Sequence, residues 1–338
     1  MKFVSMGATG AHVSRLCLGC MSFGKSFSDW AIDEAESLAI VKKAVEAGIN
    51  FFDTADAYGR GESEEILGRS LKALGVRRDE TVIATKVFGA MGNGPNMGGL
   101  SRKHIMQSID ASLKRLGVDY VDLYQIHRFD YGTPMEETLE AMDDVVRAGK
   151  ALYAGASTML SYQFARYRMS ARQTGRAAFV TMQNHYNLLY REEEREMIPL
   201  CLEEGVGLLP WSPLAGGLLA GSRKAGTARS ASLAGRYRRP EDQAVVDALA
   251  AVAEARGETA AQVAIAWLLA KPGVTAPIIG ATKLAQLDDP IRAVASTLSC
   301  EEMARLEAPY APQAVYGHYG ADHSAARLAQ MRSSSRAR

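Results

Sequence analysis

Long hydrophobic runs are missing from this chain of 338 residues. The longest apolar candidate, GVGLLPWSPLAGGLLAG, is interrupted by Pro210 and Pro213. No run approaches the roughly 18 residues needed to span a membrane. The N-terminal MKFVSMGATG also lacks the apolar segment of a signal peptide. We therefore expect a cytoplasmic protein that does not have a membrane as its partner.

An excess of charge of either sign is missing too. The 39 Lys and Arg residues nearly balance the 38 Asp and Glu residues, for a net charge of +1. Such a balance favours neither nucleic acid nor an anionic surface as a partner. We therefore expect no nucleic-acid partner, and the sequence indicates no particular oligomeric state.

Cysteine is scarce, with only Cys17, Cys20, Cys201 and Cys300 along the whole chain. Cys17 and Cys20 form a CxxC motif, but they lie in the apolar stretch RLCLGCM, which is typical of a strand and its exit. We expect reduced structural thiols rather than a redox or metal-binding pair, and no metal site.

What the chain does have is a repeating order of strand, loop and helix. Eight short apolar runs are predicted to be strands: Leu16–Cys20, Asn50–Thr54, Thr81–Val87, Val121–His127, Ala151–Ser157, Phe179–Asn184, Gly207–Ser212 and Ala276–Gly280. Most are continuously apolar, as in strands that are buried on both faces of a parallel sheet.

Helical patterns separate these runs, and each ends with glycine: Asp33–Gly48, Ser101–Gly117, Thr138–Gly149 and Glu192–Gly205. Ser63, Glu64 and Glu65 are typical of the N-cap and acidic first turn of another helix, without chemistry. Eight such units predict one (β/α)₈ TIM barrel domain over residues 1–338. An open doubly wound sheet is the alternative, but no G-x-G-x-x-G follows the first strand.

Two segments fall outside the repeat. Pro213–Pro240 is a long loop after the seventh strand, rich in Gly, Ser, Ala and Arg, and loops of that length are usually functional or disordered. The chain after Tyr310 is predicted to be a C-terminal loop over the barrel mouth. Its end, after about residue 320, is expected to be partly disordered.

Four ionisable side chains fall where a barrel of this kind places its chemistry, at the carboxyl ends of strands. Asp53, Lys86 and His127 end the second, third and fourth strands, and Tyr58 follows in the loop above the second. Each alone is more often a turn former, a solvated charge or a structural residue. Their coincidence at equivalent depth on adjacent strands indicates a catalytic site.

The predicted cluster can protonate an oxygen on which negative charge develops. Asp53 can compensate a buried Lys86, and the Lys86 ammonium favours the Tyr58 phenolate, which lowers the pKa of Tyr58 from its usual value near 10. Tyr58 would be the general acid, and His127 would orient the same oxygen. A carbonyl group that receives a hydride needs this assistance.

The motifs FFDTADAYG, ATK, DLYQIHR, GASTM, MQNHYN, PWSPLAGG and PIIGAT together resemble the aldo-keto reductase superfamily, from Leu16 to about Pro309. The stretches YREEEREMIPLCLEEGV and APYAP resemble its bacterial, longer-loop branch. The resemblance implies a barrel that binds NADPH/NADP+, or less often NADH, without a Rossmann domain. It also implies a catalytic tetrad of Asp53, Tyr58, Lys86 and His127.

The resemblance assigns residues to the nicotinamide end of the cofactor. Ser157 and Gln183 match the carboxamide-binding residues, and Thr158 replaces the asparagine that usually follows the serine. Trp211 matches the aromatic residue that stacks on the ring. The turn after the first strand and the strand-two carboxylate complete this end: Gly19, Cys20, Met21 and Asp53.

It assigns further residues to the phosphates and the adenosine. The pyrophosphate loop matches Ser212, Pro213, Leu214 and Gly216, and Arg229 is the candidate to close over phosphate. The adenosine end matches Ile279, Gly280, Thr282, Lys283, Gln286 and Asp289. Hydroxyl and basic groups there favour NADPH, although Pro290 replaces the usual asparagine near adenine.

The substrate pocket is predicted from loops at the same mouth: Met21, Trp30, Tyr58, Phe88, His127, Arg128 and Tyr131. Three residues of the tail could fold over it: Tyr310, Tyr316 and His318. A pocket with apolar walls and a polar base suits small-molecule carbonyl substrates, aldehydes and ketones with apolar or sugar-like bodies.

The function predicted from these residues is NADPH-dependent reduction of an aldehyde or ketone. Two other functions use the same residues and stay open. One is a nicotinamide-binding regulatory module with slow chemistry, as in the channel-associated beta subunits of this superfamily. The other is physiological oxidation of an alcohol or sugar with NADP+.

Overall fold

A computed structural model describes residues 1–26, 28–221, 237 and 239–315 of the chain. Arg229, Tyr316, His318 and the end of the tail therefore lie outside the described residues, and the predictions made for them stay predictions. Within the described residues no helix is long and apolar enough to cross a membrane, and no group of three metal-ligating side chains occurs.

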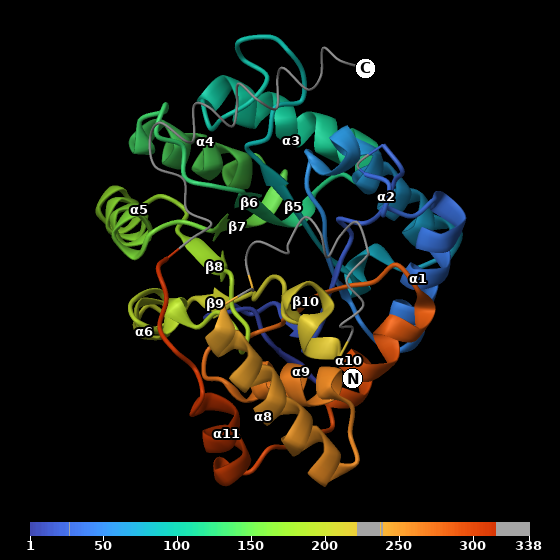
Figure 1. Ribbon diagram of the computed structural model, residues 1–338. Coiled ribbons are helices and arrows are strands. Elements are labelled where there is room, and N and C mark those ends of the chain that lie inside the picture. Colours follow the sequence, from blue (N-terminus) through green and yellow to red (C-terminus); the bar gives the residue numbers. More distant parts are fainter. Residues whose placement is uncertain (27, 222–236, 238, 316–338) are drawn as a thin grey trace.

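Eight parallel strands form a curled sheet that helices surround, the architecture of a (β/α)₈ barrel (Figure 1). The order is β10-β3-β4-β5-β6-β7-β8-β9, so each strand from β3 to β9 pairs with its neighbour in sequence. The strands are β3 (Cys17–Gly19), β4 (Phe51–Asp53), β5 (Val82–Val87), β6 (Val121–Ile126), β7 (Ala151–Ser157), β8 (Phe179–Gln183), β9 (Gly207–Leu208) and β10 (Ile278–Gly280). These are the eight predicted strands in the predicted order.

The two ends of the sheet meet through short contacts. Leu208 forms a parallel bridge with Val274, and the Ile278 amide donates to the Pro210 carbonyl at 2.8 Å. The strand predicted over residues 207–212 is reduced to two residues, because Pro210 has no amide hydrogen with which to continue the ladder.

Helices cover the outside of the barrel (Figure 1). They are α1 (Glu34–Glu46), α2 (Glu62–Ala73), α3 (Arg102–Leu116), α4 (Met135–Arg147), α5 (Ser161–Thr174), α6 (Met197–Glu203), α8 (Pro240–Arg256), α9 (Ala260–Ala270), α10 (Asp288–Ala293) and α11 (Cys300–Glu307). Short 3₁₀ turns connect them: η1 (Tyr58–Gly61), η2 (Arg78–Glu80), η3 (Glu192–Glu194), η4 (Ala215–Ala220) and η5 (Leu284–Leu287).

The capping predictions for α3 are confirmed, but the extent of one predicted helix and the N-cap of another need correction. Ser101 caps the start of α3, and Gly117 ends it with a φ of 68°. The predicted helix over residues 192–205 is divided into η3 and the shorter α6, because the backbone at Glu196 between them is not helical, with a φ of -141°. Helix α2 begins at Glu62, so Ser63 is inside its first turn and is not the N-cap.

An antiparallel hairpin, which we did not predict from the sequence, closes one end of the barrel, the end at which the parallel strands begin. It consists of β1 (Phe3–Ser5) and β2 (His12–Ser14). Met6 and Val13 pack there against barrel residues such as Cys17, Phe51 and Leu123. The hairpin fills this end with apolar side chains, so the polar residues inside the barrel gather toward the opposite end.

Candidate active site

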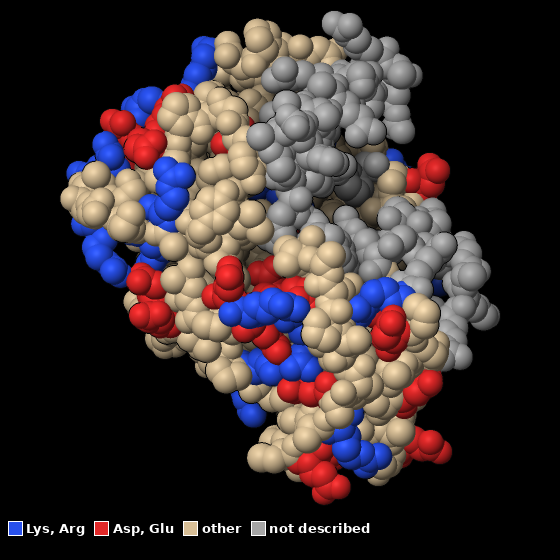
Figure 2. Space-filling view, turned by 60° about the vertical axis from the view of Figure 1, so that its left-hand side comes forward, with Lys and Arg blue, Asp and Glu red and all other residues tan. Residues whose placement is uncertain are grey.

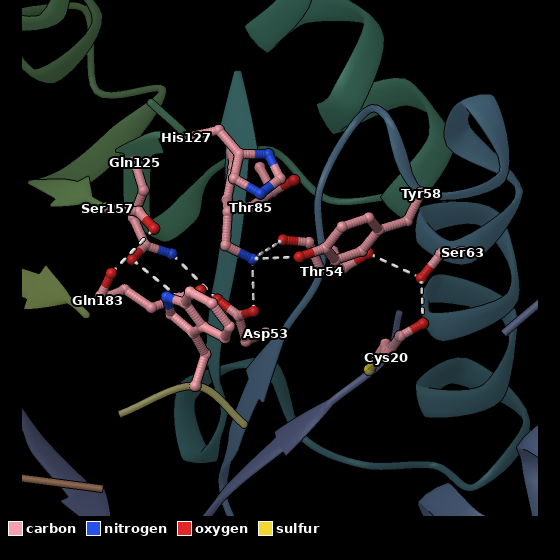
Figure 3. Close-up of polar contacts among 12 residues, drawn as sticks. Cys20, Asp53, Thr54, Tyr58, Ser63, Thr85, Gln125, His127, Ser157 and Gln183 are labelled. Carbon is pink, nitrogen blue, oxygen red and sulfur yellow. Dashed lines mark hydrogen bonds and ion pairs between the residues drawn. The ribbon is translucent and has the colours of Figure 1, made fainter. Parts of the chain in front are cut away.

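A buried ion pair lies at the centre of the site, among the side chains of Figure 3. Lys86 is fully buried, and its Nζ lies 2.5 Å from Asp53 Oδ1 and 2.8 Å from the Thr54 carbonyl oxygen. Gln125 and Gln183 donate to the other Asp53 oxygen at 3.0 and 2.9 Å. Burial alone would lower the pKa of Lys86, but the charges of Asp53 and Tyr58 and the hydrogen bonds to both together outweigh it and leave that pKa above its usual value.

Tyr58 meets this pair at the mouth of the barrel. Its hydroxyl lies 3.4 Å from Lys86 Nζ, and its ring lies edge-on to His127, with ring centroids 5.6 Å apart (Figure 3). The four residues of the predicted tetrad therefore come together. The predicted lowering of the pKa of Tyr58 is not observed, because burial raises that pKa by more than Lys86 lowers it. The phenol keeps its proton at neutral pH, as a general acid must.

The loop that carries Tyr58 has an unusual backbone. Gly59, Arg60 and Gly61 have φ values of 58°, 53° and 99°, all in the left-handed region. A side chain at Gly61 would also overlap Arg115, which passes directly beneath the loop. The φ of Gly61 therefore favours glycine, and a side chain there would also displace Arg115 from its contact with Glu64.

A second buried charge cluster, which the sequence did not predict, lies behind the loop. Glu64 lies in the first turn of α2 as predicted, but it is fully buried, and it accepts from Arg115 at 2.6 Å and from Thr85 at 2.5 Å. Asp56 is also fully buried, and neither of its carboxylate oxygens has a hydrogen-bond partner of good geometry. Burial, and then the charge of Glu64, raise the pKa of Asp56 well above its usual value.

Ser63 joins α2 to the turn after β3. Its hydroxyl donates to the Cys20 carbonyl at 2.7 Å and lies 2.9 Å from Thr54 Oγ1 (Figure 3). Cys20 itself is fully buried, and burial raises the pKa of its thiol. Cys20 is therefore a packing residue, and the turn that it shares with Gly19 and Met21 is fixed from the α2 side.

Trp211, predicted for the nicotinamide end, is partly exposed, and Thr158 of the same predicted group contacts it. Its indole nitrogen donates to Thr158 Oγ1 at 3.0 Å, and Ser157 Oγ donates to the Gln183 carbonyl at 2.9 Å. Thr158 and Ser212 have φ values of 43° and 54°, which non-glycine residues rarely adopt. Such strain concentrates at functional loops.

The predicted pyrophosphate loop is also left-handed in places. Leu214 and Gly216 lie at the start of η4, where Ala215, Gly216 and Gly217 have φ values of 48°, 68° and 102°. Pro213 is buried beside them. Arg229 lies outside the described residues.

At the predicted adenosine end, two backbone amides point at one acceptor. The amides of Thr282 and Lys283 donate to Gln286 Oε1 at 2.8 and 3.0 Å. Gly280 and Lys283 are exposed beside them, whereas Ile279 is buried and Asp289 lies within α10. Pro290 is buried in the same helix.

The predicted substrate residues differ in exposure. Met21, Trp30 and Arg128 are partly exposed, whereas Phe88 is 4% exposed and belongs to the core. Tyr131 is fixed by a 2.7 Å hydrogen bond from Gln163. The Phe88 side chain therefore has little exposed surface with which to contact a ligand.

Tyr310 was predicted as a residue that could fold over the barrel mouth. In the structure it forms hydrogen bonds with the segment that follows β8. Its hydroxyl donates to Glu192 at 2.7 Å and accepts from the Arg191 amide at 2.9 Å.

Sequence reasoning missed three side chains that shape the site: Gln125, Asp56 and His185. Gln125 could have been found, because it lies two residues before His127 and alternate residues of a strand face the same side. Nothing in the sequence distinguishes Asp56 from an ordinary loop carboxylate. His185 stacks on Trp211, with ring centroids 4.1 Å apart, and only the folded structure brings the two together.

Comparison with known proteins agrees with this geometry. The model of the Aldo/keto reductase family matches residues 15–311. Versiconal hemiacetal acetate reductase of Aspergillus parasiticus is 41% identical over 341 residues, which cover 94% of this chain and 99% of the relative. Aldo-keto reductase AMT2 of Alternaria alternata is 41% identical, with 93% and 92% covered. A putative aryl-alcohol dehydrogenase, C977.14c, of Schizosaccharomyces pombe is 41% identical, with 92% and 96% covered.

These three relatives come from fungi, so they do not support the predicted bacterial branch. The family match nevertheless spans every strand of the barrel and the whole tetrad. The chain therefore belongs to the aldo/keto reductase family and is an oxidoreductase that acts on carbonyl or alcohol groups.

Proposed function

We propose that this protein reduces an aldehyde or a ketone to an alcohol, with NADPH as hydride donor and Tyr58 as proton donor. The observation that carries the proposal is the buried ammonium of Lys86, which Asp53 compensates at 2.5 Å and which lies 3.4 Å from the Tyr58 hydroxyl. When bound, NADPH supplies a hydride to the carbonyl carbon, so that negative charge develops on the carbonyl oxygen.

The protein's own side chains then act on that oxygen. Tyr58 gives it the hydroxyl proton, and the Lys86 charge stabilises the phenolate that remains. His127 lies edge-on to the Tyr58 ring, and we assign to it the orientation of the carbonyl group. Asp53 acts through Lys86, since its carboxylate keeps a buried ammonium charged.

The chemistry of the residues at the mouth fits a nicotinamide nucleotide. Trp211 offers a partly exposed indole for stacking, and the glycines of the left-handed η4 loop would let a ligand approach the backbone closely. The amides of Thr282 and Lys283 converge on one acceptor position, which a phosphate oxygen can take in place of Gln286. The Lys283 cation beside it favours NADPH over NADH. The remaining cofactor contacts implied by the resemblance belong to the same proposal.

We further propose that the carbonyl group belongs to an aromatic compound. One relative is named for aryl alcohols, which carry an aromatic ring. Partly exposed aromatic side chains such as Trp30 and Tyr131 are consistent with such a substrate. Substituted benzaldehydes and the matching benzyl alcohols are therefore the first compounds to assay.

Replacing Tyr58 with phenylalanine tests the proposal. We expect Tyr58→Phe to lower kcat for benzaldehyde reduction by about 10²–10⁴, the usual contribution of a general acid, while NADPH binding persists. Tyr153→Phe is the control and should keep its activity, because Tyr153 packs at the end of the barrel that the β1–β2 hairpin closes. If Tyr58→Phe retained full turnover, or lost NADPH binding to the same extent, the proposed role of Tyr58 would be wrong.

The direction of the reaction is tested in the same assay. The relative named as an aryl-alcohol dehydrogenase gives a specific reason to measure alcohol oxidation with NADP+ beside aldehyde reduction. Faster oxidation at equal cofactor concentration would assign the reverse reaction to the same residues. Tight NADPH binding without turnover in either direction would favour the regulatory module.

A further inference from the structure

Trp211 is one of three aromatic rings that are stacked in a row. Its indole lies parallel to the His185 imidazole, with centroids 4.1 Å apart and 9° between the planes. The other face of His185 stacks on Tyr190 at 4.3 Å and 15°. His185 and Tyr190 are buried, so the indole rests on a rigid support behind its partly exposed side.

The orientation of His185 is fixed from the far end of the long loop after β9. Tyr237 is buried, and its hydroxyl lies 2.5 Å from His185 Nε2. Asn187 donates to the same hydroxyl at 3.1 Å and to the Ser212 carbonyl at 2.9 Å. These bonds connect the imidazole to the residue that follows Trp211.

The edge of the indole is held as well, since its nitrogen donates to Thr158 Oγ1 at 3.0 Å. His185 thus determines where the plane of the indole lies, and Thr158 determines its rotation within that plane. A ring fixed in two ways is pre-organised for stacking and loses little freedom when a ligand binds.

We propose that His185 and Tyr237 are positioning residues for Trp211, and that they set the affinity for the nicotinamide ring. This inference rests on the proposed function, because it requires a nicotinamide cofactor. It assigns no contact with substrate to either residue. Both act through the indole, so their effect is confined to the nicotinamide half of the cofactor.

The test compares a whole cofactor with a fragment that lacks nicotinamide. Tyr237→Phe keeps the ring and removes only the hydroxyl, and His185→Leu removes the stacking surface. We expect both to weaken NADPH binding by about 3- to 10-fold, the value of one aromatic contact or hydrogen bond. Binding of adenosine 2′,5′-bisphosphate should not change. Tyr153→Phe is the matched control.

Tryptophan fluorescence measures both titrations, and near-ultraviolet circular dichroism of the ligand-free variants reports the indole environment. Equal weakening of NADPH and of the bisphosphate would mean a merely structural role and would overturn the inference, as would unchanged NADPH binding. If His185→Leu does not fold, Tyr237→Phe decides alone. Wild-type protein that binds neither NADPH nor NADH would overturn the proposed function and this inference together.

Discussion

Lys86 is a fully buried cation whose charge is compensated by Asp53. Its side chain is 0% exposed and its Nζ lies 2.5 Å from Asp53. Lys86→Met would leave the Asp53 carboxylate buried without a cation, and breaking such a pair costs about 3–5 kcal/mol. We expect urea unfolding to show this loss, and the double variant Asp53→Asn/Lys86→Met to recover much of it. Lys72→Met on the exposed side of α2 is the control. A double variant no more stable than Lys86→Met would contradict this account.

Asp56 predicts a dependence of stability on pH. Burial raises its pKa in the folded state above the value near 3.9 expected in the unfolded chain. Below about pH 4 both states are protonated, and above it only the unfolded chain ionises until the folded pKa is reached. The wild type should therefore lose up to about 1.4 kcal/mol per pH unit across that window, relative to Asp56→Asn, which does not titrate.

Urea unfolding of wild type and Asp56→Asn at pH 5, 6, 7 and 8 measures this difference. The advantage of the Asn variant should grow with pH, and a constant difference would mean that Asp56 is ionised in the folded protein. The exposed Asp119→Asn is the control.

The positions of the catalytic residues could be predicted from the sequence, but the pKa of Tyr58 could not. Asp53, Lys86 and His127 could be placed because each ends a recognisable strand, and the barrel brings strand ends together. The pKa of Tyr58 could not be predicted correctly, because it depends on how deeply the phenol is buried as well as on the Lys86 charge. Burial of that kind follows from packing between elements that are distant in sequence.

Helices α2 and α3 approach each other closely at one glycine. A Cβ built on Gly68 would overlap the Leu116 carbonyl at the end of α3. Alanine favours a helix over glycine by about 1 kcal/mol, so helix propensity alone predicts that Gly68→Ala is stabilising. We expect the opposite, a net loss of about 1–3 kcal/mol in the free energy of unfolding, because backbone cannot move aside as a flexible side chain can.

The midpoint of urea unfolding checks this prediction. Gly10→Ala is the matched control, since a Cβ there meets nothing within 4 Å. A Gly68→Ala variant as stable as wild type would mean that α2 and α3 can separate at little cost.

Elements with a strong local pattern were predicted well. All eight strands appear in order, because each is a short apolar run that must be buried on both faces. The β1–β2 hairpin was missed, since its strands have three residues each and little periodicity. The division of residues 192–205 into η3 and α6 was missed for another reason: nothing in the sequence marks the non-helical backbone at Glu196.

At the scale of the whole molecule, charges of both signs occur on the described part of the face in Figure 2, where blue and red side chains lie close together below its centre. This agrees with the net charge of +1. Ion pairs inside this distribution connect remote parts of the chain. Arg191, after β8, pairs with Glu194 at 2.7 Å and with Glu307 of α11 at 3.0 Å.

Glu307, at the end of α11, makes several charged contacts with residues outside that helix. One oxygen accepts from the Trp267 indole at 2.8 Å and lies 3.1 Å from Lys271, and the other pairs with Arg191.

Because a hydrogen bond to a charged group contributes about 1.5–3 kcal/mol, Glu307→Gln should lower the free energy of unfolding in urea by that much. It should also speed amide hydrogen exchange in α11 while exchange in β5 and β6 is unchanged. The exposed Glu301→Gln on the same helix is the control. Faster exchange throughout the barrel would instead make α11 part of one cooperative unit with the strands, because local opening leaves the protection of the core intact.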